Sequence, residues 1–328
     1  MAVAVARGAV SAEPAASPLP RVRFEPPGLA IGVAVPHYGL DANSEAIEAA
    51  TETAERLGWS GGAWVQDHLL VEAASRDPYG RVFEALATLA YLAGRTRSIV
   101  LGTSVIVPPM RDAILLAKEL AAIDALSRGR LIVGVGAGWD LAEFTNLGHA
   151  DRFGVRGAYL DETIALWRHL WSGSRAPFDG RLLRLGSDFE FAPLPFRPGG
   201  PPIWIGGRSA AAYRRAGAIG DAFHSGELMD GPARYGAAVA EVAAAADAAG
   251  RPTPPLSARL NIRFGRDHGW RRYAVDGSPA DVASGLERFR AIGLSHVVCN
   301  FGLHDPDALV KAMERFDAEV RAVLPDAC

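Results

Sequence analysis

Eight short apolar runs alternate with helix-length amphipathic segments along most of this 328-residue chain. This alternation is typical of parallel strands joined by crossover helices. The expected strands cover residues 29–35, 62–66, 98–106, 130–136, 202–207, 221–225, 256–264 and 295–301. Eight such units within about 300 residues predict an α/β fold, a (β/α)8 TIM barrel with an insertion after the fourth strand–helix unit. An open α/β sheet is the alternative.

Helices are expected over residues 44–57, 81–93, 112–126, 156–171 and 305–323, with Ser44 as the N-cap of the first. Residues 173–200, rich in proline, glycine and aromatic residues, interrupt the alternation and predict a small hairpin. Insertions of this kind often cover the active site of a barrel. Residues 1–27 have the composition of a disordered extension, or follow from a mis-assigned start, so 28–328 is the expected barrel domain.

Composition excludes several classes of function. A net charge of -3 gives no basic field for nucleic acid or an anionic membrane. No apolar run approaches the roughly 20 residues that cross a bilayer. Cys299 and Cys328 lie far from any metal-ligand spacing, which predicts no metal site and fits a reducing cytoplasm. Lys118 and Lys311, the only lysines, fall on expected helices, which excludes a catalytic lysine at a strand end.

Polar residues at the strand ends matter most, because the active site of a barrel lies at the carboxyl ends of its strands. The second strand ends in Asp67-His68, which combines a group that exchanges protons near neutral pH with an orienting carboxylate. A structural hydrogen bond would also explain this pair. His37 and His224 follow or end other strands and either line the mouth or serve a structural role.

Two glycine turns follow neighbouring strands. The fourth strand runs into Gly134–Gly138, and the fifth into Gly206-Gly207-Arg208 just before a helix. Glycine turns expose backbone amides to anions, and a helix N-terminus carries partial positive charge. Together the turns predict a phosphate site, although each alone is equally compatible with a tight turn.

These motifs resemble a known family, the bacterial luciferase-like flavin and deazaflavin oxidoreductases. The resemblance is strongest in LGTSVIVPPMRDAILLAKELAAIDALSRGRLIVGVGAGW (101–139) and continues in WVQDHL (64–69) and PPIWIGGRSAAAYRRAGAIGDAF (201–223). It is looser in GSPADVASGLERFRAIGLSHVV (277–298) and covers about residues 29–323 in all. The motifs look most like the branch that uses the deazaflavin coenzyme F420.

The resemblance implies roles for individual residues. The bond between Ser104 and Val105 is expected to be a non-proline cis peptide that supports the cofactor ring. Asp67 would contact the ring system, and His68 would face the substrate and manage one proton as the catalytic residue. The implied phosphate site comprises the backbone of Ala137, Gly138, Gly206 and Gly207, with Arg208 as an additional contact.

One position departs from the family pattern. Where members that oxidise a sugar phosphate have a glutamate after the fourth-strand turn, this chain has Trp139. An aromatic wall favours a less polar small molecule as substrate, with His37 and His224 as further candidates for the pocket.

The resemblance therefore predicts an F420-dependent oxidoreductase that transfers a hydride between the deazaflavin and a small organic substrate, which we expect not to be a sugar phosphate. One alternative is an FMN-dependent monooxygenase that uses oxygen and depends on a separate flavin reductase. Another is a flavin-binding barrel without catalysis. A homodimer is also expected, because related barrels commonly pair through their second and third helices.

Overall fold

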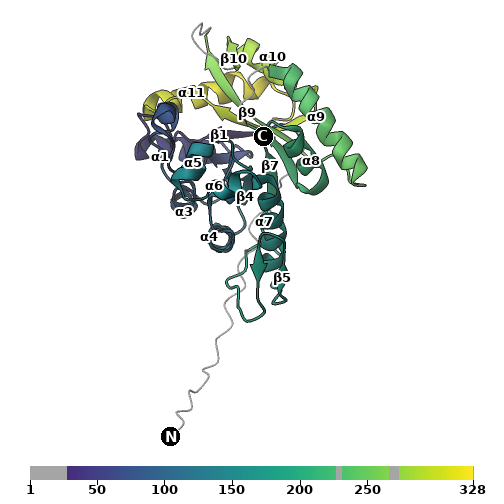
Figure 1. Ribbon diagram of the computed structural model, residues 1–328. Helices are drawn as coiled ribbons and strands as arrows, with labels where there is room; N and C mark the ends of the chain where they lie inside the picture. The colour runs from purple at the N-terminus through teal and green to yellow at the C-terminus, as the bar shows by residue number, and fades with distance from the viewer. Residues whose placement is uncertain (1–27, 227–230, 266–272, 328) are drawn as a thin grey trace, which may run out of the picture.

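The computed structural model describes residues 28–226, 231–265 and 273–327, so the expected extension over 1–27 lies outside the described residues. Eight parallel strands form the barrel (Figure 1): β1 (Ala30–Ala34), β2 (Gly62–Val65), β3 (Leu101–Thr103), β4 (Leu131–Val135), β7 (Ile203–Gly206), β8 (Ala222–Ser225), β9 (Leu256–Phe264) and β11 (Leu294–Asn300). Each pairs with the next in this order, and β11 pairs with β1. This closure confirms the predicted (β/α)8 barrel and rules out the open sheet.

One long helix follows each barrel strand in the described part of the chain: α1 (Ser44–Arg56), α3 (Ala85–Arg95), α4 (Ala113–Leu126), α7 (Arg156–Trp171), α8 (Ala210–Ile219), α9 (Gly231–Ala248), α10 (Pro279–Arg290) and α11 (Pro306–Glu319). Shorter elements are α2 (Arg76–Tyr79), α5 (Leu141–Asn146), α6 (Ala150–Phe153), and the 3-10 turns at Ala73–Ser75, Pro108–Met110 and Arg321–Val323. A further strand, β10 (Ala274–Gly277), pairs in parallel with the end of β9. None of the described helices is both long and apolar enough to cross a bilayer.

Three differences between the predicted and observed element boundaries have a clear physical cause. Asn43, rather than Ser44, caps α1, since its side chain accepts a hydrogen bond from the amide of Ala46 at 2.8 Å. Strand β3 is much shorter than 98–106, because the chain leaves the ladder after Thr103. Helix α3 begins four residues later than expected, because Glu84 acts as its N-cap.

Large aromatic side chains fill the barrel interior. Trp64 and Trp204 lie within a buried cluster with ring centroids 5.0 Å apart. Gly102 makes room for them, because a Cβ at that position would lie 2.4 Å from the Trp64 ring. The interior is therefore packed, and a ligand can enter only from the ends of the strands.

The expected hairpin exists but lies elsewhere than over the active site. Its strands, β5 (Phe178–Asp179) and β6 (Arg184–Leu185), follow the C-terminus of α7 (Figure 1). The inserted segment packs on the outer helices, where Glu162 of α7 accepts from two hairpin amides and Asp124 of α4 accepts from the amide of Arg197. Helix α7 runs from the carboxyl edge of the barrel back to the amino edge, so this segment does not cover the mouth.

Candidate active site

The predicted site residues gather at one edge of the barrel. Strand register aligns Val65 of β2 with Thr103 of β3, and Val135 of β4 with Ile205 of β7. Asp67-His68, Ser104-Val105 and the two glycine turns all begin within two residues of these paired positions. Parallel strands end at the same edge, so segments distant in sequence meet there.

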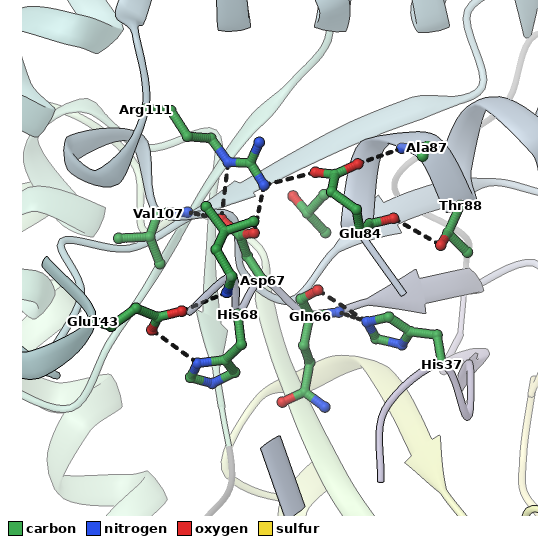
Figure 2. A network of polar contacts seen from close by, with 12 residues as sticks. His37, Gln66, Asp67, His68, Glu84, Ala87, Thr88, Val107, Arg111 and Glu143 are labelled. Carbon is green, nitrogen blue, oxygen red and sulfur yellow. Dashed lines mark hydrogen bonds and ion pairs between the residues drawn. The ribbon is translucent and has the colours of Figure 1, made fainter. Parts of the chain in front are cut away.

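Asp67 is fixed by a buried ion pair (Figure 2). The Nη2 of Arg111 donates to Asp67 Oδ1 at 2.6 Å and to Glu84 Oε1 at 2.7 Å, and the amide of Val107 donates to Asp67 Oδ2 at 3.0 Å. The Asp67 side chain is 0% exposed. Burial alone would lower the pKa of Arg111, but the carboxylates of Asp67 and Glu84 outweigh burial and raise it.

This ion pair bears on the role expected for Asp67. Both carboxylate oxygens accept hydrogen bonds within the protein, and the side chain is 0% exposed in this structure. Through Val107 and Arg111, Asp67 anchors the segment that follows Val105. These contacts give Asp67 a structural role, and its expected contact with a cofactor ring stays a prediction.

His68 is held by a carboxylate that the sequence did not single out. Glu143 of α5 lies with Oε2 3.1 Å from His68 Nδ1 (Figure 2). Its Oε1 accepts from the amide of Leu69 at 2.5 Å. Burial raises the pKa of Glu143, but the hydrogen bonds from His68 and Leu69 outweigh it, and the pKa is lowered overall. An ionised Glu143 can only accept, so Nδ1 of His68 must carry a hydrogen.

The other ring nitrogen of His68, Nε2, is not held by the described part of the protein. Among the described residues, Nε2 of His68 has no hydrogen-bond partner. The ring packs against Tyr79 with centroids 4.1 Å apart and lies 6.3 Å from the ring of Trp139, edge to face. Trp139 is 61% exposed, so it forms an open aromatic surface beside His68. His68 therefore combines an oriented imidazole with a nitrogen that can accept a proton.

The peptide bond between Ser104 and Val105 is cis, as the family resemblance implies. The Val105 side chain fits into a space lined by glycines. A Cβ on Gly206 would lie 2.5 Å from Val105 Cγ1, and one on Gly136 would lie 2.7 Å from Cγ2. Gly206 thus makes room for Val105, and the phosphate contact expected from its backbone stays a prediction.

The two turns beyond these glycines retain free amides. Gly138 has φ +82° and Gly207 has φ +141°, conformations that favour glycine. In residues 28–226, 231–265 and 273–327, no acceptor binds the backbone amides of Ala137, Gly138 or Arg208, which lie beyond the ends of β4 and β7. Helix α8, capped by Ser209, starts directly after the second turn. Unpartnered amides beside a helix N-terminus fit an anionic group such as a cofactor phosphate.

His37 and His224 do not line an open surface. Both are fully buried, and burial is the main cause that lowers the pKa of each ring. The ring nitrogens of His37 lie 3.0 Å from the carbonyl of Val35 and 2.9 Å from that of Gln66. His37 therefore ties the end of β1 to the end of β2, and His224 lies inside the barrel. Of the three proposed pocket residues, Trp139 alone is exposed.

Other polar residues at the mouth were not predicted. Arg259 and Asn261 lie on β9 and Asn300 on β11, and all three are buried, with the side-chain amide of Asn300 donating to Asn261 Oδ1 at 2.8 Å. Alternating polar residues in a buried strand, Ser257, Arg259 and Asn261, were the available signal, because alternate residues face one side of a sheet. The side-chain nitrogen of Gln66, at the end of β2, is buried without a hydrogen-bond partner in the described structure.

Comparison with known proteins shows the family to which this chain belongs. The sequence model of a family described as luciferase-like monooxygenase matches residues 30–265, and the chain belongs to this family. It is 31% identical to the F420-dependent glucose-6-phosphate dehydrogenase of Mycolicibacterium fortuitum over 230 residues, 69% of this chain and 66% of that protein. It is 29% identical to the F420-dependent hydroxymycolic acid dehydrogenase of Mycobacterium tuberculosis (strain ATCC 25618 / H37Rv), over 73% of this chain and 63% of that protein.

The match thus spans less than two thirds of these curated relatives' own length. Solved structures share the fold across nearly the whole barrel. An F420-dependent secondary alcohol dehydrogenase in complex with an F420-acetone adduct superposes with a TM-score of 0.76 at 18% identity, covering 90% of this chain and 99% of that one. The FMN-bound oxygenating constituent of 3,6-diketocamphane monooxygenase from Pseudomonas putida gives 0.75 at 14% identity, with the same coverage.

Proposed function

We propose that this protein is a coenzyme F420-dependent oxidoreductase that interconverts an alcohol and a carbonyl compound. The observation that carries the proposal is the His68–Glu143 pair, which sets an oriented proton acceptor at the barrel mouth. Two curated relatives and one structural neighbour are named as F420-dependent dehydrogenases, with a sugar phosphate, a hydroxymycolic acid and a secondary alcohol in their names. Each name gives the dehydrogenation of a compound that bears a hydroxyl group.

The chain's own residues would bind the cofactor and manage one proton. The amides of Ala137, Gly138 and Arg208 would hold the phosphate, Gly207 would supply the turn conformation, and Val105 would support the ring. When bound, coenzyme F420 supplies a carbon centre that accepts or donates a hydride. In the oxidative direction, Nε2 of His68 would take the hydroxyl proton of the substrate, while the Glu143 carboxylate stabilises the positive charge on the ring.

The substrate we propose is an alcohol of low polarity rather than a sugar phosphate. Trp139 supports this, because it gives the entrance an exposed apolar face beside His68. The glucose-6-phosphate dehydrogenases among the relatives make sugar phosphates the competing class. Kinetics with secondary alcohols of increasing chain length and with glucose 6-phosphate would separate the two, and faster turnover of glucose 6-phosphate would overturn our choice.

Cofactor titration tests the proposal directly. Purified full-length protein is titrated with F420 and with FMN, and binding is followed by fluorescence. We expect saturable binding of F420 and, with bound F420, turnover of alcohols without oxygen consumption. Tight FMN binding with none for F420 would favour a monooxygenase served by a separate reductase. Binding of either cofactor without turnover across the panel would favour a non-catalytic barrel.

A second copy of this chain is the proposed protein partner. Helices α3 and α4, the second and third long helices of the barrel, expose Tyr91, Ile114 and Leu115 at 46%, 41% and 57%. These apolar side chains lie on two helices that pack against each other. Such a surface favours burial against a second subunit, and no nucleic acid or membrane partner is proposed.

A further inference from the structure

A continuous chain of hydrogen bonds passes through the interior of the barrel. It begins at Ser104, whose Oγ lies 2.7 Å from Nε2 of His224, and the Nδ1 of His224 lies 2.8 Å from Oγ of Ser257. Ser257 Oγ lies 2.8 Å from Nδ1 of His296, whose Nε2 lies 2.8 Å from the carbonyl oxygen of Gly61. The chain therefore links the cofactor edge of β3 to the residue before β2, at the opposite edge of the barrel.

Aromatic packing fixes both histidine rings of this chain. The ring of Trp64 stacks on His224 with centroids 5.2 Å apart and planes 11° apart. Trp204 meets His296 edge to face at 4.8 Å. Both imidazoles are thus held between large buried side chains, where rotation would require repacking of the barrel interior.

The direction of every hydrogen bond follows from the last acceptor. The carbonyl of Gly61 can only accept, so Nε2 of His296 must donate. In a neutral ring, Nδ1 of His296 then accepts, and the hydroxyl of Ser257 must donate to it. The oxygen of Ser257 accepts in turn from Nδ1 of His224, which leaves Nε2 of His224 to accept from the hydroxyl of Ser104.

Neutral rings fit this environment. Burial lowers the pKa of His296 to about 4 and lowers the pKa of His224 well below its ordinary value, with the positive charges near it acting in the same direction. At neutral pH both rings are uncharged, so each has one donor and one acceptor nitrogen.

The chain cannot conduct a proton to solvent. It ends at the carbonyl of Gly61, which also accepts from Nε1 of Trp64 at 2.6 Å and is no proton acceptor near neutral pH. A chain with fixed ends and no exit sets the orientation of its first hydroxyl rather than transferring charge.

We infer that His224, Ser257 and His296 are positioning residues that point the hydroxyl hydrogen of Ser104 into the barrel, so that Ser104 offers only oxygen lone pairs to a ligand at the mouth. Ser104 would then select a ligand edge that carries an N–H or O–H donor. The direction of these hydrogen bonds does not depend on the proposed function, whereas a role for Ser104 in holding the deazaflavin ring rests on it.

The first test needs no cofactor. Long-range ¹⁵N–¹H spectra of the full-length protein, labelled on histidine, distinguish the tautomers of each ring at neutral pH. We expect His224 protonated on Nδ1 and His296 on Nε2, with assignments from the His224→Gln and His296→Gln variants. Either ring in the opposite tautomer, or charged at pH 7, would overturn the inference, whatever cofactor the protein binds.

The second test breaks the chain in its middle. Ser257→Ala removes the link between the rings, so we expect mixed tautomers at His224 and about 10-fold weaker F420 binding, the size of one lost hydrogen bond. Ser295→Ala is the matched control, because its hydroxyl bonds to the carbonyl of Leu256 outside the chain. We expect the control to keep wild-type affinity and spectra.

A double-mutant cycle separates positioning from general damage. If Ser257 acts through Ser104, then Ser257→Ala should add no loss of affinity in a Ser104→Ala background. If Ser257→Ala weakens cofactor binding equally in the wild-type and Ser104→Ala backgrounds, the inference is contradicted. If neither F420 nor FMN binds the wild-type protein, the proposed function fails, while the tautomer test still decides the hydrogen-bond directions.

Discussion

The carboxylate of Glu143 holds His68 at two points, through ring Nδ1 at 3.1 Å and through the amide of the next residue, Leu69, at 2.5 Å. The first contact sets the tautomer of the imidazole, and the second fixes the backbone that carries it. Because Glu143 lies on α5, which follows β4, the pair also joins the ends of two barrel strands. The orientation of the His68 ring therefore depends on a residue from another segment.

Glu143→Gln should lower turnover by about 10²-fold or more, approaching the loss in His68→Ala, while leaving cofactor affinity within a few-fold. The glutamine cannot stabilise a positive charge on His68, although it preserves the size of the side chain. Steady-state kinetics and cofactor titration on the same samples measure the two effects. Asp140→Asn is the control, since Asp140 caps α5 without touching His68 and asparagine also caps well. Unchanged turnover in Glu143→Gln would remove Glu143 from the mechanism.

Arg111→Met should destabilise the protein by about 3 kcal/mol or more, because it leaves the fully buried carboxylate of Asp67 without its cation. The control is Arg95→Met, whose ion pairs with Glu48 and Glu52 are solvent-exposed and should contribute less than about 1 kcal/mol. Urea unfolding monitored by tryptophan fluorescence provides both values. Equal losses in the two variants would show that the Asp67–Arg111 pair does not carry the stability we assign to it.

Gly206→Ala should weaken cofactor binding, because the new Cβ would overlap Val105 and move it. In the double variant Gly206→Ala/Val105→Ala, the shortened side chain at position 105 should relieve the overlap. Its loss of cofactor affinity should therefore be smaller than the sum of the losses in the two single variants. Gly226→Ala is the control, since a Cβ there meets no atom within 4 Å. Additive losses would mean that Gly206 acts on the cofactor independently of Val105.

Much of the fold could be predicted because each strand and helix carries its own local pattern. The helix over 156–171 matches α7 residue for residue, and strand 256–264 matches β9. Where two adjacent residues both make good caps, as Asn43 and Ser44 do, local pattern cannot choose between them, and the side-chain geometry selected Asn43. Local sequence pattern could not predict where the hairpin lies either, because its position depends on which outer helices provide hydrogen-bond partners.

The site was predicted less completely, since its key contacts join distant segments. Arg111 lies 44 residues from Asp67, and Glu143 lies 75 residues from His68. Neither pairing leaves a spacing motif, so the sequence predicted neither the ion pair that buries Asp67 nor the carboxylate that holds His68. The family resemblance did identify the cis bond at Ser104, because that feature belongs to one short, recognisable segment.

Leu115→Glu should convert the proposed homodimer into a monomer. Leu115 is 57% exposed on α4, and a buried, unpaired carboxylate at a subunit interface would oppose association. Sedimentation velocity of wild type and variant measures the change. Val323→Glu is the control, because Val323 is 64% exposed, slightly more than Leu115, but lies after α11, away from α3 and α4. A wild-type protein that sediments as a monomer at micromolar concentration would contradict the proposed pairing.

The buried histidines should make stability fall as the pH decreases from about 6.5 towards 4. In the folded state the pKa of His296 is lowered to about 4, so within this window the unfolded chain binds more protons than the folded one. Stability therefore rises with pH, and His37 and His224, with lowered pKa values, act in the same direction. Glu143 acts at a different pH. Its pKa is lowered in the folded state, so the stability that it contributes is lost only as the pH falls below the ordinary glutamate range.

Urea unfolding of wild type and His296→Gln at pH 7.5, 6 and 5 isolates the contribution of one ring. Glutamine retains a donor for the carbonyl of Gly61 but has no proton to gain. The variant should be less stable at pH 7.5, yet lose less stability on acidification, by up to about 1.4 kcal/mol per pH unit. Parallel curves for the two proteins would mean that His296 does not titrate as its burial requires, and that the acid sensitivity arises from His37 and His224.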